Sequence, residues 1–342
     1  MKKKLIKIMV TLMICVLSVS LLAGCGGNNE NGSENEAETT ILKVGHAYGD
    51  TYPLHTALQK MSETIYEKTD GRYKLDIHAN SQLGGETDLI EGVSLGTVDM
   101  CFTATTPLAN TVPSLMELDL PFLIEDYDHA DAVFYDENSE IRKSIIEDID
   151  AAGFKTLALC ENGFRQLVAN KPIDSIDDLK GLKIRVMENQ LHLELWKALG
   201  ASPTTMSGSE ALTAIQQGTV DSVEMFNSAI ISAGFAELVD YYTKTNHIYT
   251  CGTLLMSSSV WNNMSEEDQA IFMEAAMELS TSVNKELRET DDANYEMLVG
   301  DEYGLKEGNI DAAELKARVQ SVYDNHPEYS EFVKKVRELA KK

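Results

Sequence analysis

Residues 86–102 of the 342-residue chain read ETDLIEGVSLGTVDMCF, and this stretch decides the fold class. It predicts a helix over Glu86–Leu95 that ends at Gly96, followed by a short buried strand over Val98–Phe102. Glycine readily adopts the left-handed conformation that closes many helices. A helix that passes through one tight turn into a buried strand is typical of α/β proteins.

The same alternation extends to both sides of this stretch. Towards the N-terminus we expect a strand over 41–47, a helix over 53–69 and a strand over 73–79. Beyond a looser segment with three prolines, we expect strands at 154–160, 164–169, 182–187 and 220–226 and capped helices at 175–181, 189–199 and 210–217. This order implies βαβ units and a largely parallel sheet. A long helix over 265–298 and one or two helices from Asp311 onward complete the chain.

One four-residue segment occurs twice. GTVD stands at 96–99 and again at 218–221, each time between a predicted helix and a predicted strand. Such junctions are common, so the repeat could arise by chance. The alternative interpretation is that the chain folds into two similar α/β lobes.

The N-terminus predicts export and lipid anchoring. Residues 1–24 carry four lysines and then an apolar stretch, which is typical of a signal peptide. The segment LAGC at 22–25 looks like a bacterial lipobox, so we expect Cys25 to carry a diacylglycerol, with residues 25–40 as a flexible tether. A cleaved signal with a chance cysteine is the alternative. Three later cysteines lie singly in apolar runs and are expected to be buried thiols: Cys101, Cys160 and Cys251.

The charge excludes one class of partner. The chain has 29 basic and 55 acidic residues and a formal net charge of −26, with no basic stripe. This field repels polyanions, so we expect no nucleic-acid partner. It also opposes small anions, which would need positive groups placed locally in a cleft.

Candidate binding residues come from the predicted ends of strands. In open α/β sheets, ligands bind beyond the carboxyl ends of the strands, often at helix N-termini. Arg185 lies in an apolar strand, where a structural salt bridge and ligand binding are equally good interpretations. Together with Arg165 it could clamp a carboxylate, because guanidinium groups bind carboxylates in a bidentate way. The other candidates are His46, Thr103, Met225 and Asn227.

Motifs of common enzymes are absent from the sequence. It contains no GxSxG, GxGxxG, P-loop or HExxH, and its seven histidines show no spacing typical of a metal site. We therefore expect a protein that is not an enzyme and that has no cofactor and no metal.

Eight short motifs stand in one order along the chain: SQLGGE (81–86), GTVD (96–99), PF (121–122), NGFR (162–165), DLKGLKIRV (178–186), LGASPT (199–204), QGTVD (217–221) and TNH (245–247). In this order and spacing they resemble the DctP-type solute-binding subunits of TRAP transporters. The resemblance implies a two-lobed fold of the periplasmic-binding-protein type (type II-like) with a long hinge-spanning helix. The implied lobes are 41–162 plus 251–290, and 163–250 plus 291–342.

The resemblance also implies a function and a site. The ligand would be a small organic acid, namely a sugar acid, a dicarboxylate or a keto acid, which is delivered to the permease subunits in the membrane. Arg185 would grip its carboxylate, Arg165 would add a second contact, and Glu86 would reach its hydroxyl groups. A monomer on the extracytoplasmic face of the cytoplasmic membrane is expected. The alternatives are a ligand-sensing lipoprotein that feeds a membrane receptor, and an extracytoplasmic enzyme.

Two departures from the family pattern leave the ligand open. Gly208 stands where the family often has an aromatic residue, so a wall against the ligand would be missing. Met225 stands where the family often has an asparagine, so an amide contact would be lost unless Asn227 replaces it.

Overall fold

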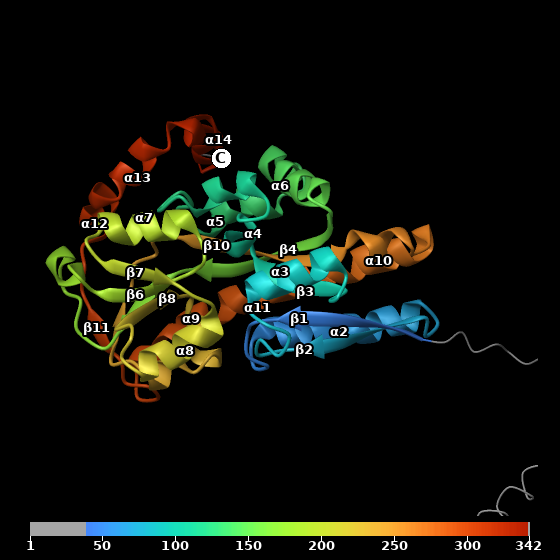
Figure 1. The fold of residues 1–342 in the computed structure, drawn as a ribbon, viewed down its shortest axis with the longest axis horizontal. Helices are drawn as coiled ribbons and strands as arrows, with labels where there is room; N and C mark the ends of the chain where they lie inside the picture. The colour runs from blue at the N-terminus through green and yellow to red at the C-terminus, as the bar shows by residue number, and fades with distance from the viewer. Residues whose placement is uncertain (1–38, 341–342) are drawn as a thin grey trace, which may run out of the picture. The chain divides into compact units, whose positions relative to one another are not determined.

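The strands of the protein form two β-sheets in a computed structural model that describes residues 39–340 (Figure 1). The predicted signal peptide, Cys25 and nearly all of the predicted tether lie outside the described residues. The first sheet has the order β2-β1-β3-β10-β4. It consists of β1 (Thr40–His46), β2 (Tyr73–His78), β3 (Met100–Ala104), β4 (Phe154–Phe164) and β10 (Tyr249–Ser257).

The second sheet has the order β11-β9-β5-β8-β6-β7. It consists of β5 (Gln166–Ala169), β6 (Lys183–Val186), β7 (Ser202–Thr205), β8 (Ser222–Met225), β9 (Tyr241–Thr243) and β11 (Lys306–Gly308). Only one residue separates β4, in the first sheet, from β5, in the second. The chain therefore crosses between the lobes at this point.

Both sheets are mixed, so the prediction of a largely parallel sheet is wrong. β2, β1 and β3 are parallel to one another, as are β7, β6 and β8. In contrast, β10 is antiparallel to both β3 and β4, and β5 is antiparallel to both β8 and β9. These antiparallel partners are distant in sequence, so a local alternation of strands and helices does not reveal their direction.

Each lobe repeats one strand–helix unit, as the two GTVD segments predict. The first lobe runs β1, α2 (Pro53–Lys68), β2, α3 (Glu86–Leu95), β3, and the second runs β6, α7 (Gln190–Ala198), β7, α8 (Gly208–Gln216), β8. Gly96 and Gly218 are both left-handed, with φ of 72° and 66°. Asp99 N–H donates to the Lys43 carbonyl at 3.1 Å, and Asp221 N–H donates to the Lys183 carbonyl at 2.8 Å. The repeated segment therefore starts the third strand of each repeated unit in the same way.

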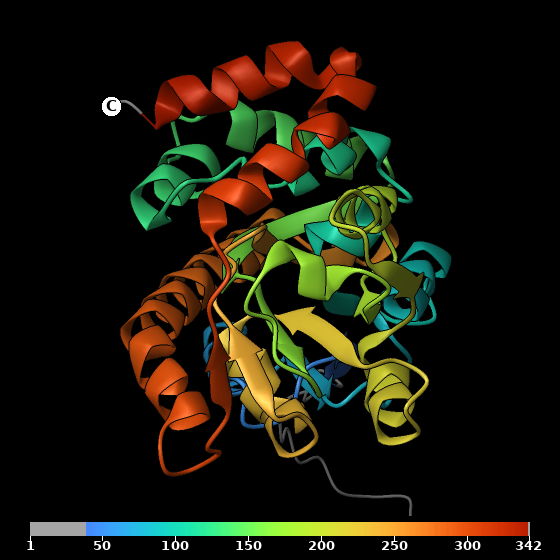
Figure 2. The same cartoon turned by 90° about the vertical axis from the view of Figure 1, so that its left-hand side faces the viewer.

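One long helix belongs to both lobes, which confirms the predicted two-lobed fold with a hinge-spanning helix. α11 (Glu266–Val299) has 34 residues, and the Ser265 hydroxyl caps its N-terminus. Phe272 and Leu279 are buried in the core of the first lobe, and Leu298 is buried in the core of the second. Figure 2 shows α11 descending along one side of the sheets.

The remaining helices are short. At the C-terminus the structure has three of them rather than one or two, and His129 contacts the carbonyl of Val336 in the last at 2.8 Å. Their bounds are α4 (Thr105–Leu108), α5 (Tyr127–Ala130), α6 (Glu140–Ala151), α9 (Asn227–Ser232), α10 (Ser258–Asn262), α12 (Ala312–Arg318), α13 (Gln320–Asn325) and α14 (Ser330–Leu339).

The backbone of Gly252 in β10 lies directly against the buried ring of Phe102 on the neighbouring strand. A methyl group at this position would overlap with that ring, so we expect Gly252→Ala to reduce the free energy of unfolding by about 1–3 kcal/mol. Thermal unfolding followed by circular dichroism measures the change. Gly208→Ala is the matched control, because nothing lies within 4 Å of a Cβ there. Equal stability of the two variants would contradict the close packing at Gly252.

Candidate functional site

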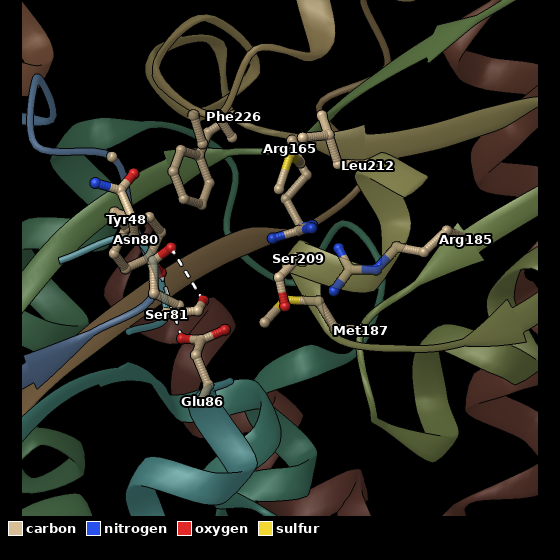
Figure 3. Close-up of a pocket in the computed structure, with 16 residues that line it drawn as sticks. Tyr48, Asn80, Ser81, Glu86, Arg165, Arg185, Met187, Ser209, Leu212 and Phe226 are labelled. Carbon is tan, nitrogen blue, oxygen red and sulfur yellow. Dashed lines mark hydrogen bonds between the residues drawn. The ribbon is translucent and has the colours of Figure 1, made fainter. Parts of the chain in front are cut away.

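A cavity of about 290 Å³ is lined by residues of both lobes (Figure 3). Its size is near the lower end of the range for small-molecule pockets, about 300–1,000 Å³, so it suits a small ligand. Six residues supply polar or charged side chains to the wall: Asn80, Ser81, Glu86, Arg165, Arg185 and Ser209. Much of the remaining wall is apolar or aromatic: Tyr48, Met187, Leu212, Met225, Phe226 and Ala229.

Arg185 comes from the carboxyl end of β6 and is only 3% exposed. Its Nε donates to the carbonyl of Met206 at 2.9 Å, and this is the one hydrogen bond of the Arg185 side chain to other described residues. Burial lowers the pKa of Arg185 to about 10, with the charge of Arg165 adding to the effect while Glu224 opposes it. The guanidinium is therefore charged at neutral pH, with its two terminal nitrogens left for a ligand in the cavity.

Arg165 lies at the crossing between β4 and β5, immediately after Phe164. Its Nε forms an ion pair with the carboxylate of Glu224, and its second terminal nitrogen donates to the Glu224 carbonyl at 2.5 Å. Both side chains are buried. Arg165 is thus held by the protein, and in Figure 3 its guanidinium points towards the same part of the cavity as Arg185.

Behind Arg165 lies a buried polar cluster that no local sequence pattern predicts. His192 contacts Glu224 at 3.3 Å and Asp119 at 3.2 Å, and His247 contacts Glu224 at 3.2 Å. Burial alone would lower the pKa of His192, but Glu224 and Asp119 outweigh it and raise this pKa. Burial would raise the pKa of Glu224, but Arg165 and His192 hold it well below its usual value. The cluster therefore carries charges that compensate one another.

Glu86 is the first residue of α3 and lines the opposite side of the cavity. Its Oε1 accepts a hydrogen bond from the N–H of Ala104 at 2.7 Å and from the hydroxyls of Thr103 and Tyr48, each at 3.4 Å. Burial raises the pKa of this carboxyl group, although the hydrogen bonds from Ala104 and Thr103 and the two cavity arginines oppose the shift. Figure 3 shows Glu86 across the cavity from both arginines.

Asn80 and Ser81 also line the cavity, and the sequence analysis does not select them as site residues. Both have positive φ, 56° and 55°, which is uncommon for residues other than glycine. Their N–H groups donate to the carbonyls of Tyr48 and His46, at 2.8 and 3.3 Å, and so tie this turn to the end of β1. Strained backbone of this kind is concentrated at functional sites.

The structure separates the sequence-predicted site residues into two groups. Arg165, Arg185, Glu86 and Met225 line the cavity. The other three lie behind its wall. Thr103 contacts Glu86, the His46 ring contacts His55 at 3.0 Å, and the Asn227 amide is bonded to Asp291 and Tyr242, at 3.0 and 2.9 Å. Because both ends of its amide are already bonded, Asn227 does not take the place of the amide missing at Met225.

Between residues 39 and 340, no helix is long and apolar enough to cross a membrane. In the same range, no three histidine, cysteine or acidic side chains are arranged to hold a metal ion.

A two-lobed α/β fold with an arginine-lined cavity between the lobes defines a solute-binding protein. Residues 44–329 match the family described as bacterial extracellular solute-binding protein, family 7 (DctP). The chain therefore belongs to this family, whose members are extracytoplasmic, bind small acids and work with membrane permease subunits. These are binding proteins and not enzymes, so family membership decides against catalysis.

Three proteins illustrate the similarity. A solute-binding protein from Verminephrobacter eiseniae is 34% identical over 290 residues, which cover 84% of this chain and 81% of that protein. A TRAP periplasmic solute binding protein from Polaromonas sp. JS666 bound to D-erythronate has a TM-score of 0.82 at 33% identity, covering 88% of this chain and 98% of that one. The sugar acid binding protein DctPAm from Advenella mimigardefordensis in complex with galactonate has a TM-score of 0.84 at 28% identity, covering 89% and 98%.

The buried ion pair gives a prediction for stability. Glu224→Gln leaves the buried Arg165 without its anion, so we expect the free energy of unfolding to fall by about 3–5 kcal/mol at neutral pH. Because the folded-state pKa of Glu224 is depressed, its contribution is present above its ordinary pKa of 4.5 and is lost as the pH falls through the lower value. Glu224 also raises the pKa of His192, so the difference between wild type and variant should grow as the pH falls from 8 to the ordinary His192 value of 6.5. It should then stay nearly constant to about pH 5 and shrink below 4.5.

Urea unfolding at several pH values measures this difference. Glu91→Gln, an exposed position on α3, is the control for loss of one negative charge. A loss below about 1 kcal/mol, the range of exposed ion pairs, would contradict the role of Glu224.

Proposed function

We propose that this protein captures a small organic acid of the sugar-acid type and delivers it to TRAP permease subunits. The observation that carries the proposal is the Arg185 guanidinium, which is almost fully buried and forms no ion pair with any described acidic residue. A buried charge is costly without a partner. A ligand carboxylate in the cavity supplies that partner through two parallel N–H···O bonds.

The rest of the cavity supports a ligand with hydroxyl groups. Arg165 is fixed by Glu224 and adds a second cationic contact beside Arg185. Glu86 faces them from the other lobe and offers a carboxylate oxygen to ligand hydroxyls. The similar proteins described above were solved with erythronate and with galactonate, both of which combine one carboxylate with several hydroxyls.

We further propose that the lobes, 41–162 plus 251–290 and 163–250 plus 291–342, close over the ligand. Contacts across the cavity rim support this: the Thr87 hydroxyl donates to the Glu188 carboxylate at 2.8 Å, and the Asn110 amide donates to the Glu188 carbonyl at 2.6 Å. A ligand that contacts both Glu86 and the arginines has higher affinity for the closed form, and this difference drives closure.

We also propose that the protein is a monomer, held at the extracytoplasmic face of the membrane by a lipid on Cys25. The lipobox-like segment at 22–25 supports the anchor, and the polar residues after it would let the binding lobes move near the permease.

Removal of the Arg185 guanidinium should strongly weaken capture of the acid. We expect Arg185→Ala to weaken binding by about 2–5 kcal/mol, roughly 30- to 4,000-fold, and Arg185→Lys to weaken it less, because lysine keeps the charge but loses the bidentate contact. Isothermal titration with galactonate and erythronate measures the affinity. A thermal-melt screen supports it, because a millimolar acid with a micromolar Kd stabilises the fold by about 4 kcal/mol.

The control for this experiment is Arg318→Ala, which removes an exposed arginine at the end of α12. Unchanged affinity of a folded Arg185→Ala variant would contradict the carboxylate site. Stabilisation by neutral sugars alone would do the same.

The anchor is tested separately. Cys25→Ser should move the protein from the membrane fraction to the soluble fraction of cells, because the thiol that takes the lipid is gone. Immunoblots of fractionated cells measure the distribution, and Cys15→Ser, inside the predicted signal peptide, is the matched control. Continued membrane association of Cys25→Ser would contradict lipidation at this residue.

A further inference from the structure

The charges that face the cavity are unevenly compensated. The charge of Arg165 is balanced by its ion pair with Glu224, whereas Arg185 has no such partner among the described residues. Glu86 is the acidic residue on the cavity wall, and it lies more than 4 Å from both arginines, since no ion pair joins them in the described chain. One side of the cavity therefore attracts an anion, and the opposite side presents one.

The Glu86 carboxylate is held in place on that opposite side. Its Oε1 accepts three hydrogen bonds, from Ala104, Thr103 and Tyr48. The Tyr48 hydroxyl itself accepts a hydrogen bond from the Asn162 amide at 3.0 Å, which leaves its own proton for Glu86. The second oxygen, Oε2, has no hydrogen-bond donor among residues 39–340 and remains an acceptor for a ligand.

This geometry favours different chemical groups at the two ends of a ligand. At the arginine end, a carboxylate is the best partner. At the Glu86 end, a hydroxyl donates a hydrogen bond to the carboxylate, whereas a second carboxylate would place two negative charges side by side. Binding sites often discriminate between ligands by such repulsion.

We infer that Glu86 is a specificity-determining residue that makes this cavity select hydroxylated monocarboxylates and reject dicarboxylates of the same length. The inference rests on the proposed function, which puts the ligand carboxylate on Arg185. It narrows the ligand class, because the sequence alone leaves dicarboxylates open. The uncharged amide in Glu86→Gln keeps the size of the side chain and removes the repulsion.

Two pairs of acids test this selection. Galactonate and galactarate differ only at carbon 6, which is a hydroxymethyl group in the first and a carboxylate in the second. Erythronate and meso-tartrate have four carbons each and differ in the same way at carbon 4. Isothermal titration measures the Kd of the wild type for each acid. Within each pair, we expect the monocarboxylate to bind at least about 100-fold more tightly than the dicarboxylate, since like charges in contact cost several kcal/mol. Glu86→Gln should reduce this ratio by about tenfold or more, by weakening the monocarboxylate and strengthening the dicarboxylate.

Asp88→Asn is the matched control. It removes one negative charge from the first turn of the same helix, but Asp88 is exposed and does not line the cavity. The ratio of monocarboxylate to dicarboxylate affinity should stay unchanged in this variant. Circular dichroism and the melting temperature show whether each variant is folded.

The possible outcomes separate the two proposals. Equal affinity of the wild type for both members of a pair would overturn the selection while leaving acid binding intact. The same conclusion would follow if the ratio of the two affinities in Glu86→Gln equalled that of the wild type. A wild type that binds none of the four acids and is stabilised by no other organic acid would overturn both proposals. If Glu86→Gln does not fold, the wild-type ratios alone decide.

Discussion

The buried ion pair between Arg165 and Glu224 is the contact on which the rest of the site depends. Arg165 occupies the single position between β4 of the first sheet and β5 of the second, and its N–H donates to the carbonyl of Ile248 at 2.8 Å. Glu224 lies on β8, inside the second sheet. A guanidinium without a partner at this depth would be strongly destabilising. The ion pair therefore allows a cation at the crossing, where the two lobes and the cavity meet.

The same ion pair connects the lobes through the polar cluster behind it. His192 joins Glu224 to Asp119, which lies in the segment that follows α4. Asp119 in turn accepts hydrogen bonds from Thr106 at 2.7 Å and from Asn189 at 2.9 Å, the residue that caps α7. The orientation of Arg165 is thus fixed by residues from four separate elements. A binding site needs rigid surroundings of this kind to hold in place the side chains that contact the ligand.

Local sequence signals predict the elements of this fold better than their pairing. α3 has the predicted bounds because Gly96 ends it, and α11 begins after its Ser265 cap, as expected. β3 begins two residues later than predicted, at Met100, and β4 continues through Gly163 instead of ending near Cys160. That continuation depends on pairing with β10, about ninety residues later, which no local pattern contains.

The binding site shows the same difference between residues that local sequence signals reveal and residues whose role depends on distant partners. Arg185 and Arg165 can be selected because charged residues stand out in apolar strands, and Glu86 follows from the family motif. His192 looks like an ordinary residue in the sequence, and His247 stands out there only as part of the TNH motif. The role of both arises only when Glu224 is placed between them. Asn80 and Ser81 are marked by a backbone conformation that the sequence does not display.

The net charge of −26 and the binding of an anion are compatible because the two act over different distances. Exposed acidic residues are screened over about 8 Å at physiological ionic strength, so they repel large polyanions more than they influence the cavity between the lobes. Inside the cavity, desolvated charges interact much more strongly. Arg185 remains protonated there because even its lowered pKa, about 10, is well above neutral. On the proposed function, one buried cation without a partner among the described residues defines the ligand's charged end, and the acidic surface is expected to repel nucleic acids and other polyanions.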